Sequence, residues 1–122
     1  RLAEQHDRLR LVEDETGSPT HTRDLAEAVR ARARTGDYGT YHAVNAGACS
    51  RLEFATEVFR LAGVTVAVTP CAAAEFPTKA ARPRYSVLDA SALEAAAGIT
   101  MRPWRDALAD YMQRRLTSMP TG

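Results

Sequence analysis

The sequence lacks the patterns by which metal centres and redox sites are usually recognised. Its two cysteines, Cys49 and Cys71, have no CxxC spacing, so neither a zinc site nor a redox motif is supported, and two free thiols in a reducing cytoplasm are expected. The three histidines, His6, His21 and His42, lie far apart and share no metal-ligand spacing. We therefore expect no metal site in this chain.

Long apolar runs and a strong charge of one sign are also missing. No segment approaches the ~18 apolar residues that a membrane-spanning helix needs, and no basic stretch precedes an apolar one as in a signal peptide. The net charge of +1 argues against a nucleic-acid partner. With 122 residues, 45% apolar and 25% charged, the composition predicts one compact cytoplasmic domain with a modest core, bound to neither nucleic acid nor membrane.

Helix signals recur along the chain. An apolar stripe over residues 23–34 follows Thr22, a candidate N-cap, and Ser50 with Glu53 fits a capping box that starts a helix ending at Gly63. A third helix is expected over residues 89–97, capped by Asp89 or Ser91 and ended by Gly98. A fourth is expected to begin at Pro103, and its apolar face would consist of Trp104, Ala107, Leu108 and Tyr111.

Strand signals lie between these helices. Residues 9–12, 39–45 and 64–68 are rich in β-forming residues, and residues 1–9 are typical of the last turns of a longer helix. A strand over 39–45, a helix and a strand over 64–68 would make a βαβ unit with parallel pairing. The fold class is therefore α/β, with helices around a few short, partly parallel strands.

Five short motifs occur in a fixed order. They are Gly-Ser-Pro-Thr at 17–20, Asp-Leu-Ala at 24–26, Gly-Thr-Tyr-His at 39–42 followed by Asn45 and Gly47, Glu-Phe-Ala at 53–55, and Arg-Pro-Arg-Tyr-Ser-Val-Leu-Asp at 82–89. This series resembles the carboxy-terminal, sugar-nucleotide-binding part of dTDP-4-dehydrorhamnose reductases, which are extended short-chain dehydrogenases/reductases. One departure is Glu-Asp-Glu-Thr at 13–16, where relatives commonly have Asp-Gln before the Gly-Ser-Pro-Thr turn.

The resemblance points to the segment around Arg82 as the part that lies against a sugar nucleotide. An arginine beside a rigid proline can direct its guanidinium toward a diphosphate and donate two parallel hydrogen bonds. Arg84 and Ser86 are further candidates for substrate contact. The alternative is that Arg82 pairs with a nearby carboxylate and that Pro83 only shapes the loop.

Two other residues are candidates for substrate binding. Thr20 follows the rigid turn at 17–19, and it or His21 could touch a ligand, although a purely structural turn is the alternative. Asn45 ends the predicted strand over 39–45, a place where α/β folds commonly build sites, but asparagine also suits turn geometry.

The motifs that a complete reductase of this family needs for hydride transfer do not occur in the sequence. There is no GxGxxG or GxxGxxG turn, and none of the four tyrosines precedes a lysine in a Tyr-x-x-x-Lys arrangement. The resemblance therefore implies that residues 1–116 form the sugar-nucleotide-binding portion, that residues 117–122 form a tail, and that an N-terminal Rossmann domain with NADPH or NADH lies before Arg1. Mg²⁺ at a homodimer interface, which some members have, is also implied.

The function implied by the resemblance is reduction of dTDP-4-dehydro-L-rhamnose to dTDP-L-rhamnose for cell-envelope polysaccharide. Two alternatives stay open. One is a reductase of another dTDP-4-keto-deoxysugar in antibiotic biosynthesis. The other is a non-catalytic regulatory subunit resembling the methionine adenosyltransferase beta subunit, a member of the same superfamily. Loss of the Rossmann domain would leave a sheet edge exposed, which favours self-association.

Overall fold

The structure is a computed structural model that describes residues 7–76 and 78–118. Its helices are α2 (Thr22–Arg32), α3 (Arg51–Ala62), α4 (Ser91–Ala97) and α5 (Trp104–Ser118), with a short 3₁₀ turn η1 (Ala73–Glu75). Its strands are β1 (Arg8–Val12), β2 (Thr16–Gly17), β3 (Cys49–Ser50), β4 (Ala67–Cys71) and β5 (Tyr85–Ser86). These elements confirm the predicted class of helices around short, partly parallel strands.

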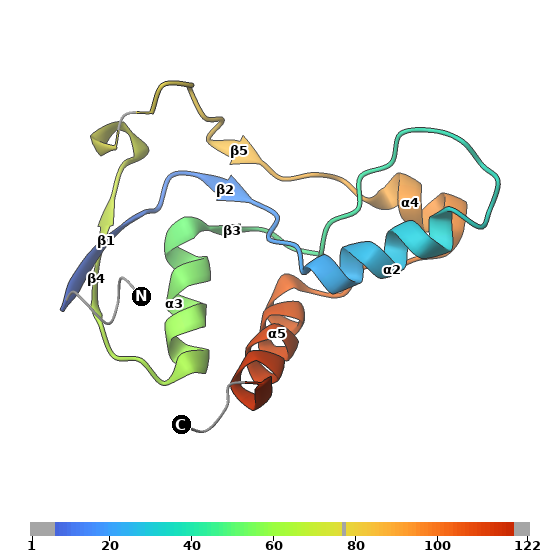
Figure 1. Cartoon of the computed structure of the whole chain (residues 1–122). Coiled ribbons are helices and arrows are strands. Elements are labelled where there is room, and N and C mark those ends of the chain that lie inside the picture. Colours follow the sequence, from blue (N-terminus) through green and yellow to red (C-terminus); the bar gives the residue numbers. More distant parts are fainter. Residues whose placement is uncertain (1–6, 77, 119–122) are drawn as a thin grey trace.

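The strands form two small sheets. β1 pairs with β4 in parallel, from Arg8 opposite Ala67 to Val12 opposite Cys71. The second sheet has the order β3-β2-β5, with β2 antiparallel to β3 and parallel to β5. Figure 1 shows α3 between the β1–β4 pair and α5, with α2 and α4 together at the opposite end. The β3-β2-β5 sheet runs along one side and links the two ends.

Two clusters of buried side chains hold the helices in place. In the first, α3 packs against α5 around Trp104, whose side chain is 5% exposed, together with Cys49 and Leu108. In the second, Leu93 of α4 contacts Ala28 of α2 and Met101. The predicted apolar face of the last helix is confirmed for its buried members, whereas Tyr111 is 42% exposed.

The capping signals predicted α3 correctly. Ser50 Oγ accepts a hydrogen bond from the amide of Glu53, and the Glu53 carboxylate accepts one from the amide of Ser50. Gly63 ends the helix with φ of 64°, a left-handed conformation that glycine adopts without a steric penalty. α2 was expected to start from Thr22, but its N-cap is His21, whose Nδ1 accepts from the amide of Arg23.

Cap positions differ from expectation in α4 as well. Its N-cap is Ala90, and neither Asp89 nor Ser91 occupies that position. The Asp89 carboxylate nevertheless accepts a hydrogen bond from the amide of Ser91 at 2.8 Å, as a capping side chain does. α5 begins directly after Pro103 and continues through Ser118, and residues 119–122 lie outside the described part.

The predicted strand over 39–45 is wrong, and so is the βαβ unit built on it. Residues 40–45 form no strand with any part of the chain that the structure describes. The amide of Asn45 donates to the Thr20 hydroxyl, and only Ala46 makes a bridge, with Pro103. The parallel unit is instead β1 and β4, with α2 and α3 between them in sequence.

Two further expectations are corrected. The strand predicted over 64–68 lies at Ala67–Cys71, where Pro70 sits opposite Leu11 in a two-stranded pair that tolerates its missing N–H. Of the helix tail predicted over residues 1–9, the first six residues lie outside the described part, whereas Arg8 and Leu9 belong to β1. In the part of the chain that the structure describes, no helix is long and apolar enough to cross a membrane.

Candidate functional site

A cleft of about 790 Å³ lies between the β2–β5 pair and the first turns of α3. Residues 15–19, residues 49–51 and Phe54 line it from β2, β3 and α3, and Arg82, Pro83 and Ser86 line it from the segment that includes β5. Its volume lies in the range of ~300–1,000 Å³ typical of small-molecule sites. The cleft therefore brings together Gly17, Ser18 and Pro19 of the Gly-Ser-Pro-Thr turn with two of the three residues predicted around Pro83.

Arg82 is the cationic group on the β5 side of this cleft. Its side chain is exposed, and among residues 7–76 and 78–118 no carboxylate pairs with it. The local ion pair that would have given Arg82 a purely structural role is thus not formed with any described residue. Arg84 does not line the cleft; its backbone carbonyl accepts from the amide of Thr16, and its side chain is exposed.

Ser86 ties β5 to β2 within one wall of the cleft. Its hydroxyl donates to the carbonyl of Thr16 at 3.1 Å, and the amide of Leu88 donates to Ser18 Oγ at 3.4 Å on the same strand pair. Gly17 allows this close approach, because a Cβ there would lie 3.2 Å from Ser86 Oγ. Ser86 therefore keeps only its acceptor lone pairs for a ligand.

Thr20 and Asn45 belong to a polar network beside the cleft. Asn45 is 1% exposed; its Oδ1 accepts from the amide of His21 at 2.8 Å, and its Nδ2 donates to Asp24 at 2.7 Å and to the Arg102 carbonyl at 3.1 Å. Thr20 Oγ1 accepts from the Asn45 amide and donates to a backbone carbonyl. Both amide hydrogens of Asn45 are thus used inside the protein.

Charged groups complete this network. Arg102 donates two hydrogen bonds of 2.8 Å to Asp24 and one of 2.9 Å to Asp110, so it ties α2 to α5. The guanidinium of Arg102 lowers the pKa of both carboxyls, and the hydrogen bond from Asn45 lowers that of Asp24 further. The aspartate of the Asp-Leu-Ala motif therefore has a structural role: it holds the start of α2 beside the turn that forms the cleft wall.

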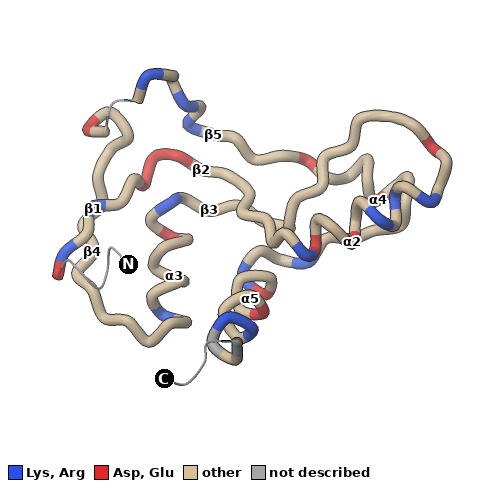
Figure 2. The backbone as a smooth tube through the Cα atoms, in the orientation of Figure 1, with Lys and Arg blue, Asp and Glu red and all other residues tan. Residues whose placement is uncertain are grey.

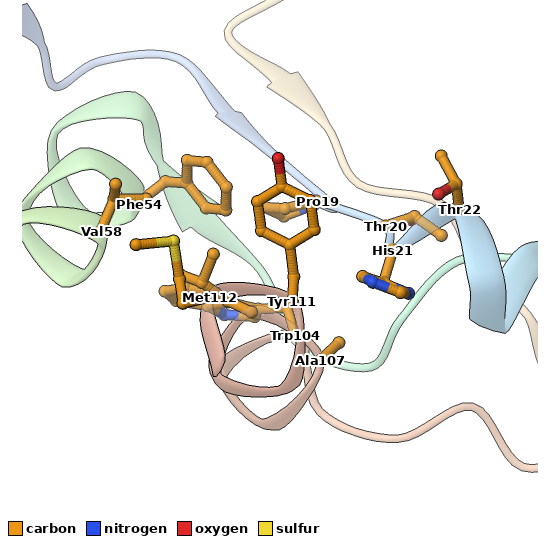
Figure 3. Close-up of a pocket in the computed structure, with 11 residues that line it drawn as sticks. Pro19, Thr20, His21, Thr22, Phe54, Val58, Trp104, Ala107, Tyr111 and Met112 are labelled. Carbon is orange, nitrogen blue, oxygen red and sulfur yellow. The ribbon is translucent and has the colours of Figure 1, made fainter. Parts of the chain in front are cut away.

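A second, apolar pocket of about 260 Å³ lies on the other side of Pro19 (Figure 3). Phe54 and Pro19 line both cavities, and the pocket continues over Trp104 and Tyr111 of α5. The His21 and Tyr111 rings meet edge to face, with centroids 5.8 Å apart. Thr20 faces this pocket and not the cleft.

Two residues that line the cleft, Glu15 and Arg51, were not among the predicted site residues. Arg51 is the first residue of α3, and its Nε lies 2.8 Å from Oε2 of Glu15. Figure 2 shows the acidic run just before β2 close to the basic start of α3. The available signal was an arginine in the first turn of a helix, where the dipole favours an acid. Their separation of 36 positions in sequence hides the pairing.

The polar groups of the cleft are those of a binding site. No group of three or more histidine, cysteine or acidic side chains that could hold a metal ion occurs in the part of the chain that the structure describes. Cys49 lines the cleft, but burial raises the pKa of its thiol to about 11. Guanidinium, hydroxyl and backbone groups remain, which can hold an anionic, polar ligand.

The chain is similar in sequence to a family of known proteins. The RmlD substrate binding domain family matches residues 1–117. The chain is 45% identical over 115 residues to the spore coat polysaccharide biosynthesis protein SpsK of Bacillus subtilis, covering 94% of this chain and 40% of that protein. It is 46% identical over 112 residues to a dTDP-4-dehydrorhamnose reductase of Mycobacterium tuberculosis H37Rv, covering 89% and 36%.

Solved structures of similar proteins have the same fold as this chain. A dTDP-4-dehydrorhamnose reductase from Clostridium acetobutylicum superposes with a TM-score of 0.90 at 44% identity, covering 97% of this chain and 41% of that one. A dTDP-4-dehydrorhamnose reductase from Bacillus anthracis in complex with NADP gives 0.89 at 35% identity, covering 93% and 41%. The chain thus spans about two fifths of the length of these proteins, and the matches confirm the resemblance that the motifs predicted.

Proposed function

Because this chain belongs to the RmlD substrate binding domain family, we propose that it is the sugar-nucleotide-binding part of a reductase that converts dTDP-4-dehydro-L-rhamnose to dTDP-L-rhamnose with NADPH. The observation that carries the proposal is the cleft beside β5, which presents the Arg82 guanidinium without a carboxylate partner among the described residues. A diphosphate is the part of such a substrate that needs a cation with two parallel donors.

The proposed roles of the site residues follow from their contacts. Arg82 binds the diphosphate directly, and Ser86 contributes hydroxyl lone pairs at the same wall. Arg84, exposed beside the cleft, adds positive potential that attracts the anion. Thr20 and Asn45 act on the substrate indirectly, because their hydrogen bonds hold the turn at residues 17–20 in place.

The partner of this part is a Rossmann domain of the same protein, which binds the nicotinamide cofactor and carries the Tyr-Lys pair. The β1–β4 sheet supports this, since two parallel strands are stable mainly within larger sheets that are covered on both faces. Extension of that sheet by the Rossmann domain would satisfy the unpaired strand edge. An enzyme of this type acts in the cytoplasm, where Cys49 and Cys71 stay reduced. Without the Rossmann domain, the same exposed edge favours association of two copies into a homodimer.

The test is NADPH oxidation by the full-length protein supplied with dTDP-4-dehydrorhamnose, followed by product analysis. Fast oxidation with dTDP-rhamnose as the product is expected. A protein that binds dTDP but does not oxidise NADPH with this substrate would overturn the choice of sugar. A protein that binds no dTDP would overturn the proposal and favour a regulatory subunit.

A second candidate is reduction of another dTDP-4-keto-deoxysugar. The run Glu-Asp-Glu-Thr at 13–16 favours it, because Glu15 of this run lines the cleft and dehydrorhamnose reductases commonly have Asp-Gln in its place. The same assay with a panel of dTDP-4-keto-deoxysugars separates the two candidates by their kcat/KM values.

A further inference from the structure

Arg51 stands at an unfavourable position for an arginine. It is the first residue of α3, directly after the Ser50 cap, where the partial positive charge of the helix N-terminus disfavours a cation. The capping box already satisfies this helix end without it. A residue that breaks a local rule in this way, inside a cleft, is expected at functional sites.

The contact with Glu15 holds the Arg51 guanidinium at its Nε, which lies 2.8 Å from Oε2 of Glu15. Within residues 7–76 and 78–118, the Arg51 side chain has no ion pair or hydrogen bond with any residue other than Glu15. The side chain of Glu15 is 13% exposed and that of Arg51 is 54% exposed. The Glu15 carboxylate is thus largely buried in the cleft wall, whereas about half of the Arg51 side chain remains accessible.

The cleft has a second cation on its other wall. Arg82 lies in the segment before β5, and both arginines line the same cleft of about 790 Å³. A diphosphate has two phosphate groups, and each can accept parallel hydrogen bonds from one guanidinium. One arginine on each wall matches that chemistry.

We propose that Arg51 is a second diphosphate-binding residue of the cleft and that Glu15 is a positioning residue, which holds the Nε edge of Arg51 so that the Nη edge points at the ligand. This inference rests on the proposed function, because the anion is the diphosphate of the sugar nucleotide. Arg51 and Arg82 clamp that group from two sides.

The experiment measures dTDP and thymidine binding to the full-length protein by calorimetry, with three variants. Arg51→Ala is expected to weaken dTDP binding by about 10- to 100-fold, the loss of one charged contact, and to leave thymidine binding unchanged. Glu15→Gln is expected to tighten dTDP binding by about three- to fivefold, because a negative charge leaves the cleft while an acceptor for Nε remains. Arg60→Ala is the matched control, since Arg60 lies on the same helix and pairs with Glu57 outside the cleft.

The opposite signs of the two effects separate binding from a structural role. If the ion pair served only the fold, both Arg51→Ala and Glu15→Gln would lower the melting temperature and neither would tighten dTDP binding. Unchanged dTDP affinity in Arg51→Ala, or a loss equal to that for thymidine, would overturn the inference while the proposed function stands. If Arg51→Ala does not fold, Arg51→Gln supplies the same comparison. Failure of the unaltered protein to bind dTDP would overturn the proposed function itself.

Discussion

Replacement of Asn45 by alanine should destabilise the protein strongly. The side chain is 1% exposed and makes three hydrogen bonds, to the His21 amide, the Asp24 carboxylate and the Arg102 carbonyl. Alanine leaves these three groups buried without the hydrogen bond from or to Asn45, and each unsatisfied group costs ~1–3 kcal/mol of folding free energy. Because Asp24 keeps its bonds to Arg102, we expect a total loss of about 3 kcal/mol, a large part of a typical stability of ~5–15 kcal/mol.

Urea unfolding followed by circular dichroism measures this loss. With a slope of ~1–3 kcal/mol/M, the midpoint of Asn45→Ala should fall by about 1–3 M. Gln113→Ala, an exposed change on α5, is the control and should stay within ~0.5 kcal/mol of the unaltered protein. A midpoint for Asn45→Ala that coincides with the control would refute the assignment of Asn45 as the centre of the network.

Three other predictions concern stability and reactivity. Ser50→Ala removes one half of the α3 capping box and should cost about 1 kcal/mol, seen as a lower melting temperature; no change would mean that the cap is not needed. Arg102 lowers the pKa of Asp24 in the folded protein, so the ionised Asp24 stabilises the fold fully above the unfolded-state pKa of ~3.9, and this stabilisation is lost as the pH falls below that value. In Arg102→Leu, the urea midpoint should therefore fall less steeply with decreasing pH than in the unaltered protein. An equally steep fall in both proteins would contradict this role of Arg102. Because burial raises the pKa of Cys49 to about 11, iodoacetamide should label it far more slowly in the folded than in the unfolded protein at neutral pH, and equal rates would contradict its burial.

Local signals in the sequence predicted the helices well. The capping box at Ser50 and the left-handed Gly63 depend on residues within one or two turns of each other, so α3 could be placed to within a residue. The same holds for the motif resemblance, which depends on short strings of residues. It predicted the family, whereas the cleft that Arg82 and Ser86 line is known only from the structure.

Non-local pairing could not be predicted in the same way. Residues 39–45 have strand-forming composition, but the backbone of Asn45 bonds to the Thr20 side chain, a partner 25 positions away. The parallel pair of β1 and β4 joins residues about 59 positions apart, as in Leu11 opposite Pro70. The ion pair of Glu15 with Arg51 was missed for the same reason, since neither residue signals the other locally.

Binding of a sugar nucleotide through Arg82 in the cleft beside β5 is tested by calorimetric titration of dTDP. The titrated proteins are the full-length protein, its Arg82→Ala variant and, as a control, Arg30→Ala on the exposed side of α2. Arg82→Ala is expected to weaken dTDP binding by about 10- to 100-fold, the equivalent of ~1.5–3 kcal/mol for a hydrogen bond to a charged group, while Arg30→Ala binds as the unaltered protein does. Equal dTDP affinity in all three proteins would contradict a role of Arg82 in binding.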